Sequence, residues 1–236
     1  MSLVKIPFII LDAINMRVNA TPPNPPIPLC ESIIPDWRER FLRSLALPSR
    51  LLRAMYWTTC LIEILVIIAS QFPSNVVSKH ILTTLILNRT SPLRIRVTPL
   101  FILGNIIGIC GTTLRVQSFR TLGCLFTFEL CIRKNHRLVV NGPYAFIRHP
   151  SYTGLIMTII GYYCNHASGS WLRECGLLET ILGKLMLCVW MTIAGAVVAS
   201  LLLRVSREDQ ILQMKFGEEW ERWARRVPYK LVPGIY

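Results

Sequence analysis

The segment from His136 to Gly154 concentrates side chains that can bind and orient charged groups. It reads HRLVVNGPYAFIRHPSYTG and contains two histidines, two arginines and two tyrosines. A helix that begins near Pro150, where a missing N–H costs nothing, leaves free backbone N–H groups that favour an anion such as a carboxylate. A basic loop beside a membrane, with His and Arg on lipid headgroups and Tyr at the interface, explains the same residues. Composition alone leaves both interpretations open.

A second cluster, RVSRED, runs from Arg204 to Asp209. Arg204 and Glu208 are four residues apart and therefore share one face of a helix. Such a pair can hold a substrate carboxylate on the arginine and a cationic ligand on the glutamate, or it can form an ordinary salt bridge at a helix end. If residues 152–203 form a helical hairpin, this cluster returns to Arg148 and His149. Two polar clusters that converge at one mouth favour a binding site.

Apolar stretches must position these clusters. Of the 236 residues, 52% are hydrophobic and only 17% are charged, whereas a soluble domain carries about 25% charged residues. This composition excludes disorder, and eight scattered cysteines without a CxxC pair argue against a disulfide scaffold. We predict an all-α integral membrane protein, a multi-span bundle of about five helices, since a helix needs roughly 20 apolar residues to cross the hydrocarbon core. The predicted spans are Leu51–Phe72, Val97–Val116, Tyr152–Cys164, Leu177–Leu203 and, as a candidate fifth, Leu3–Met16.

The distribution of basic residues predicts the orientation of these spans. The net charge of +13 would suit nucleic acid in a soluble protein, but here Lys and Arg lie between apolar stretches, where they set membrane topology. Basic residues flank the Pro-rich linker at 21–28 and are frequent in the segment 115–148 and in the tail 204–236, so these three parts are placed in the cytosol. The basic residues of loop 71–96 run against this scheme. We divide the chain into N-terminal membrane helices (1–116, with a Pro-rich linker at 21–28) and a second region, 117–236. That region comprises a loop (120–151), a helical hairpin (152–203) and a tail (204–236).

Shorter patterns predict local structure around the clusters. Phe126–Ile132 alternates as a half-buried strand does, with Leu138–Val140 as its return partner, and this hairpin puts Glu129 on the face opposite Phe126. Glycines at 104, 108 and 111 lie within an apolar span and predict close helix packing rather than a nucleotide-binding loop. Apolar residues at helical spacing in the tail predict an amphipathic helix against the bundle or the membrane surface; they are Leu212, Phe216, Trp220 and Trp223.

Together these stretches resemble the isoprenylcysteine carboxyl methyltransferase family. HRLVVNGPYAFIRHPSYTG, preceded by FTFELCIRKN, is similar to the core motif of that family. RVSREDQILQMKFGEEWERWARRVPYKLVPGI is similar to its C-terminal motif, including the Arg-x-x-x-Glu pairing. The resemblance covers residues 114–236, and Val140, Asn141 and Asp209 depart from the residues usual in the family.

The resemblance implies an integral enzyme of the endoplasmic reticulum membrane whose active site faces the cytosol. Such an enzyme uses S-adenosylmethionine to methylate the C-terminal carboxylate of an S-prenylated cysteine in processed CaaX proteins. Arg204 would be the catalytic residue that binds this carboxylate. The cofactor pocket would be formed by Glu129, His136, Arg137, Leu138, Val139, Tyr144, His149, Pro150, Ser151, Tyr152 and Glu208. We expect no nucleic-acid partner and no metal site, because no His, Cys or acidic residues have metal-ligand spacing.

The chemistry of the acceptor is consistent with these residues. An α-carboxyl titrates near about 3.3–3.7 and is already ionised at neutral pH, so its methylation needs no general base. Arg204 therefore has an orienting role. Phospholipid N-methylation, with phosphatidylethanolamine as acceptor, is the alternative; it requires removal of a proton from an ammonium that Arg204 would repel. A membrane scaffold without enzymatic activity would need neither cluster.

Overall fold

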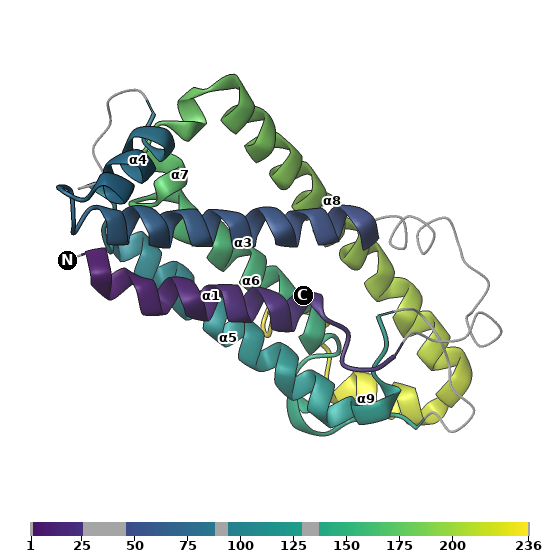
Figure 1. Cartoon of the computed structure of the whole chain (residues 1–236). Coiled ribbons are helices and arrows are strands. Elements are labelled where there is room, and N and C mark those ends of the chain that lie inside the picture. Colours follow the sequence, from purple (N-terminus) through teal and green to yellow (C-terminus); the bar gives the residue numbers. More distant parts are fainter. Residues whose placement is uncertain (1, 26–45, 88–93, 129–136, 236) are drawn as a thin grey trace.

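The computed structural model describes residues 2–25, 46–87, 94–128 and 137–235, and it contains no strand within these ranges (Figure 1). Segments long and apolar enough to cross a membrane lie in three of its helices, Arg50–Ala69, Pro99–Leu125 and Ile181–Phe216. They coincide with the three longest predicted spans. The helices are α1 (Lys5–Ala20), α3 (Ala46–Ala69), α4 (Val76–Leu85), α5 (Pro99–Leu122), α6 (Pro150–Ala167), α7 (Trp171–Glu174), α8 (Ile181–Phe216) and α9 (Glu218–Arg226), with 3-10 turns η1 (Ser2–Val4), η4 (Gly123–Leu125), η5 (Gly142–Ala145) and η6 (Leu177–Glu179).

Helices α1, α3, α5 and α6 lie side by side, and α8 runs past them at an angle (Figure 1). The Lys5 ammonium lies 4.4 Å from the centre of the Phe101 ring, so α1 and α5 run in the same direction. It also pairs with Glu63 of α3 at 2.5 Å and donates to the Gly169 carbonyl, beyond α6, at 2.7 Å. Helices α3 and α6 therefore run in the opposite direction. All five predicted apolar stretches are helical, and α6 and α1 are the shorter ones, with 18 and 16 residues.

Helices α5 and α6 meet backbone to backbone along a line of glycines. A Cβ atom on Gly104 would lie 2.8 Å from the Gly161 carbonyl oxygen, and one on Gly111 would lie 2.6 Å from the Gly154 carbonyl oxygen. No side chain fits at these distances, so each glycine is required by the close approach of the neighbouring helix. The predicted close packing is confirmed for Gly104 and Gly111, whereas a Cβ on Gly108 would meet its nearest atom, in the Asp12 side chain, only at 3.9 Å.

Helix α1 is fixed to this pair by polar side chains. Asp12 accepts a hydrogen bond from the Asn165 amide of α6, and the Asn19 amide donates to the Thr112 hydroxyl of α5 at 2.8 Å. All four side chains are buried. Because a buried polar group without a partner is costly, these pairs set the register of α1 against α5 and α6.

The strand hairpin predicted at Phe126–Ile132 and Leu138–Val140 is wrong where the structure describes it. Phe126 to Phe128 and the segment 137–140 are irregular. The rings of Phe126 and Phe128 lie 4.3 and 6.4 Å from the Phe119 ring of α5. Their alternation therefore reflects docking onto the end of a helix and not pairing with a second strand. Residues 129–136, with Glu129 and His136, lie outside the described part of the chain.

Helix α8 continues without a break from Leu203 to Arg204, where the predicted helical hairpin ends and the predicted tail begins. It ends at Gly217, whose φ of +51° favours glycine and lets the chain turn into α9. The amphipathic tail helix predicted from Leu212, Phe216, Trp220 and Trp223 is divided at Gly217: the first two residues belong to the end of α8 and the two tryptophans to α9. Trp220 and Trp223 of α9 are buried against Tyr144 and the end of α8, so the apolar face of α9 packs on the protein.

Candidate functional site

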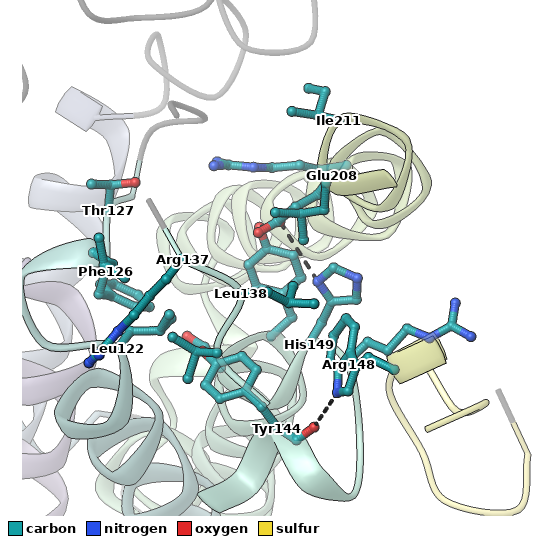
Figure 2. A pocket seen from close by; sticks show the side chains of 17 residues that line it. Leu122, Phe126, Thr127, Arg137, Leu138, Tyr144, Arg148, His149, Glu208 and Ile211 are labelled. Atoms are coloured by element: carbon teal, nitrogen blue, oxygen red, sulfur yellow. Dashed lines mark hydrogen bonds and ion pairs between the residues drawn. The ribbon is translucent and has the colours of Figure 1, made fainter. Parts of the chain in front are cut away.

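A cavity lies where α5, the loop before α6, and the second half of α8 meet (Figure 2). It encloses about 100 Å³, within a total free space of about 870 Å³ that includes its open mouth. Figure 2 shows Leu122, Phe126 and Thr127 on one side of it and Glu208 and Ile211 of α8 on the other. The structure therefore brings the two predicted polar clusters, 56 positions apart at Tyr152 and Glu208, to one place.

Most of the predicted site residues line this cavity. Pro150 does not: it is fully buried in the first turn of α6, which begins there as predicted. Glu129 and His136 cannot be placed, because they lie outside the described residues. The predicted residues on the cavity wall are Arg137, Leu138, Val139, Tyr144, His149, Ser151, Tyr152, Arg204 and Glu208.

Arg204 and Glu208 lie one turn apart on α8 and both face the cavity. The Arg204 side chain is buried, with 7% of the residue exposed, and its Nη1 donates to the Phe128 carbonyl at 2.6 Å. Glu208 accepts a hydrogen bond of 2.5 Å from the Tyr152 hydroxyl, and 29% of its side chain remains exposed. The cavity thus has a guanidinium and a partly accessible carboxylate side by side on one helix.

His149 connects the start of α6 to α8. Its Nε2 lies 3.0 Å from Asp209 Oδ1, its Nδ1 lies 3.7 Å from Glu208 Oε2, and its ring stacks on that of Tyr152 at 5.4 Å. Arg148 Nη1 donates to the other Asp209 oxygen at 3.2 Å. Asp209 therefore holds both the Arg148 guanidinium and the His149 imidazole. Figure 2 shows the contact between His149 and Glu208 as a dashed line.

The segment after α9 completes this arrangement. The Arg148 guanidinium donates to the Val227 and Ala224 carbonyls at 2.8 and 3.0 Å, and the His149 backbone N–H donates to the Lys230 carbonyl at 2.9 Å. These bonds fix the turn that precedes α6. The role of this segment could not be found by reasoning from sequence periodicity, since each bond joins residues more than 70 positions apart.

Tyr144 forms the floor of the cavity in the turn η5. Its carbonyl accepts a hydrogen bond of 3.1 Å from the Trp223 indole N–H, drawn as a dashed line in Figure 2. Burial, reinforced by the negative charge of Glu208, raises the pKa of the Tyr144 hydroxyl well above its ordinary value. The hydroxyl is therefore neutral at physiological pH and can donate a hydrogen bond.

Sequence reasoning missed the apolar part of the wall. Leu122 at the end of α5, Leu125 of η4 and Phe126 form one apolar side, and Ile211 and Leu212 of α8 are apolar residues on the α8 side. The alternation that suggested a strand was the available signal, since it does mark Phe126 as facing the protein. The whole wall suits a ligand with an aromatic or apolar part and separate charged groups.

Comparison with known proteins agrees with the resemblance seen in the motifs. Residues 103–167, which comprise most of α5, the loop and α6, match the sequence model of the isoprenylcysteine carboxyl methyltransferase (ICMT) family. The chain is 30% identical over 122 residues to protein-S-isoprenylcysteine O-methyltransferase B of Arabidopsis thaliana, covering 51% of this chain and 53% of the relative. The predicted family resemblance is thereby confirmed.

Sterol reductases are also similar to this chain. It is 28% identical over 120 residues to a probable 7-dehydrocholesterol reductase of Acanthamoeba polyphaga mimivirus, covering 51% of this chain and 23% of that protein. It is 30% identical over 101 residues to a delta(14)-sterol reductase of Mus musculus, covering 42% of this chain and 20% of that protein. The chain thus spans about half the length of its methyltransferase relative and less than a quarter of these reductases.

Proposed function

We propose that this chain is a membrane enzyme that methylates the C-terminal carboxylate of an S-prenylated cysteine with S-adenosylmethionine. The observation that carries the proposal is the placement of buried Arg204 one turn before accessible Glu208 on the cavity wall. A guanidinium suits a carboxylate acceptor, and a carboxylate suits a cationic methyl donor. The methyltransferase relatives support the same assignment.

The side chains on the wall fit S-adenosylmethionine, which combines a sulfonium, an amino acid zwitterion and an adenine ring. Glu208 presents negative charge for its cationic groups, and Tyr152 and Ser151 offer hydroxyls. Arg137 brings a guanidinium for its carboxylate, and the aromatic wall that includes Tyr144 offers a surface for the ring. Leu138, Val139 and His149, which the resemblance also assigns to the cofactor pocket, would help to hold S-adenosylmethionine. When bound, this cofactor supplies an electrophilic methyl group.

Arg204 then orients the substrate. Its guanidinium takes one carboxylate oxygen and leaves the other free to attack in line with the S–CH₃ bond. With S-adenosylmethionine bound, that oxygen would accept the methyl group and the sulfonium would leave as a neutral thioether. Opposite charges are neutralised, so the buried and partly dry position of Arg204 favours the step. The acceptor is already ionised, and no side chain has to remove a proton.

The prenyl chain reaches this site from the bilayer. Helix α8 exposes large apolar side chains along the part before Arg204, among them Leu182, Leu185, Val189 and Met191. Its second half carries the two charged site residues. A prenyl group dissolved in the membrane can follow this helix to the cavity while the carboxylate meets Arg204. Processed CaaX proteins would be the substrates, at the cytosolic face of the endoplasmic reticulum membrane.

Phospholipid N-methylation and sterol reduction each require chemical groups that carboxyl methylation does not. Phospholipid N-methylation attacks with an amine and requires a base for the ammonium, whereas Arg204 repels such an acceptor. Reduction of a sterol double bond requires a hydride donor and a proton, and it leaves Arg204 without a carboxylate to bind. Neither activity explains the Arg204–Glu208 pair.

The test is methyl transfer from labelled S-adenosylmethionine by the purified full chain in lipid vesicles. N-acetyl-S-farnesylcysteine, phosphatidylethanolamine and a 7-dehydrosterol with a nicotinamide donor are offered in parallel. We expect base-labile label on the farnesylcysteine only. Label on the lipid supports the phospholipid activity, and reduced sterol supports the reductase; either result without ester formation rejects the proposal. No reaction and no cofactor binding leaves a scaffold.

A further inference from the structure

Arg115 of α5 is a buried cation that does not line the cavity. The residue is 4% exposed, and its Nη1 donates to the Ser151 hydroxyl at 2.9 Å and to the Ser151 carbonyl at 3.0 Å. Ser151 lies in the first turn of α6 and is itself part of the cavity wall. Arg115 thus holds a wall residue through both its backbone and its side chain.

We call residues 119–128, which include the wall residues Leu122, Leu125, Phe126 and Thr127, the rim of the cavity. The Arg115 guanidinium packs against two aromatic rings of this rim, Phe119 and Phe128. Its central carbon lies 5.0 Å from the centre of the Phe119 ring and 5.3 Å from that of Phe128. Cation–π contacts of this kind are strengthened when they are removed from water. Phe128 is also the residue whose carbonyl accepts the hydrogen bond from Arg204. Arg115 and Arg204 therefore fix the same residue from two sides, one through its ring and one through its backbone.

Helix α1 holds Arg115 from the other direction. Arg115 Nη2 donates to the Asn19 carbonyl at 3.3 Å, and the Asn19 amide fixes that end of α1 through the Thr112 hydroxyl at 2.8 Å. Beyond α1, the Asn24 amide donates to the Gly123 and Phe126 carbonyls, both at 2.8 Å. The N-terminal helix and the residues after it are thus tied to the same rim of the cavity.

These contacts form one connected path. It begins at the end of α1, passes through Arg115 and divides to Ser151 on the cofactor wall and to Phe128 beside Arg204. Helix α1 lies outside residues 103–167, the part that matches the methyltransferase family. A side chain needed only for stability could be replaced by an apolar one of similar volume at little functional cost, because a buried charge is often no more stabilising than a well-packed apolar side chain.

We propose that Arg115 is a positioning residue through which α1 sets the geometry of Ser151, on the cavity wall where the cofactor would bind, and of Arg204, which would bind the substrate. The inference rests on the proposed methyl transfer. Arg115 does not line the cavity in which substrate and cofactor would bind; it acts through Ser151 and Phe128. Loss of its guanidinium lets the first turn of α6 and the rim at Phe128 move, and both binding steps suffer.

The test compares three variants of the full chain in vesicles with the wild type. R115M removes the hydrogen bonds at similar volume, R115K keeps the charge and part of the bonding, and T112V loosens α1 without touching Arg115. We expect R115M to raise the KM for S-adenosylmethionine and to lower kcat, each by about tenfold, as the loss of a charged hydrogen bond predicts. R115K should recover part of both, and T112V should show a smaller change in the same direction.

Asn105→Ala is the matched control. Asn105 is a buried polar residue of the same helix, and its amide contacts Asn165 at 3.2 Å, far along α5 from the cavity. N105A should lower the melting temperature and leave KM and kcat at wild-type values. If N105A and R115M change the kinetic constants alike, or if R115M changes neither, the positioning role is refuted.

Amide hydrogen exchange separates this proposal from the proposed function. R115M should speed exchange in the first turn of α6 and around Phe128 and leave α7 unchanged, with no substrate present. This result holds even if the wild type methylates nothing, in which case only the methyl transfer is rejected. Unchanged exchange at both places overturns the positioning role, whatever the wild type catalyses.

Discussion

Replacement of Arg204 by alanine gives the sharpest test of the site. The guanidinium is buried on the cavity wall one turn from a partly accessible carboxylate, and under the proposed function it binds the substrate carboxylate. Truncating one partner of a buried, hydrogen-bonded charge pair costs about 2–5 kcal/mol. At about 1.36 kcal/mol for each tenfold change, kcat/KM for a farnesylcysteine acceptor should fall by roughly 30-fold to several thousand-fold.

The cofactor should be affected much less by this change. Arg204 contacts the Phe128 carbonyl, whereas Glu208 and Tyr152 hold each other without it. We therefore expect the dissociation constant of R204A for S-adenosylmethionine to stay within about threefold of the wild-type value. Loss of a hydrogen bond between the cofactor and a charged side chain would change it by more than this. Label transfer gives kcat/KM, and calorimetry on the purified variant gives the dissociation constant.

Arg207 provides the control for Arg204. It has the same charge and lies three residues further along α8, but its side chain is exposed and does not line the cavity. R207A should retain normal kinetics. The reasoning fails if R204A keeps its activity, if R207A loses as much activity as R204A, or if R204A loses cofactor binding in proportion to turnover.

Three further outcomes follow from the geometry. E208Q should weaken S-adenosylmethionine binding about tenfold, measured by calorimetry, and Y152F, which removes the 2.5 Å hydrogen bond to Glu208, should weaken it less. A dissociation constant of E208Q equal to that of the wild type excludes Glu208 from the pocket. G111A should destabilise the bundle by about 1–3 kcal/mol because its Cβ meets backbone of α6 at 2.6 Å, whereas G108A, with its nearest atom at 3.9 Å, should leave denaturation in detergent unchanged; equal effects would contradict the close packing. Because the pKa of Tyr144 is raised above 10.0, its ionisation should not limit the rate as pH rises from neutrality toward that value; an alkaline inflection below it that disappears in Y144F would show the opposite.

Much of the helical framework could be predicted because length and apolar content are strong constraints. The segments in α3, α5 and α8 were found from them, and the spaced glycines of α5 indicated close packing that Gly104 and Gly111 make. The end of α8 could not be found in the same way. The charges that follow Leu203 suggested a boundary, but Arg204 and Asp209 have partners in the folded chain, so the helix continues through them.

The convergence of the two polar clusters was predictable from the helical hairpin between them, but the individual contacts across the fold were not. Tyr144, His149 and Tyr152 could be named from sequence because they lie in one continuous motif, in the loop before α6 and its first turn. The part played by Asp209 depends on how α8 packs against that loop, and no local pattern records this. The pattern at Phe126 was misread because alternating apolar residues fit a strand and the end of a helix equally well.

The unbroken course of α8 ties the site to the thickness of the bilayer. At about 1.5 Å per residue, Arg204 lies roughly 35 Å along the helix axis from Ile181, close to the roughly 30 Å depth of a hydrocarbon core. A helix whose apolar length exceeds the local thickness tilts, and the tilt decreases as the membrane thickens. Since the same helix carries Arg204, we expect the proposed methyl transfer to depend on the acyl-chain length and sterol content of the surrounding lipid. A detergent micelle, which imposes no fixed thickness, would remove this dependence.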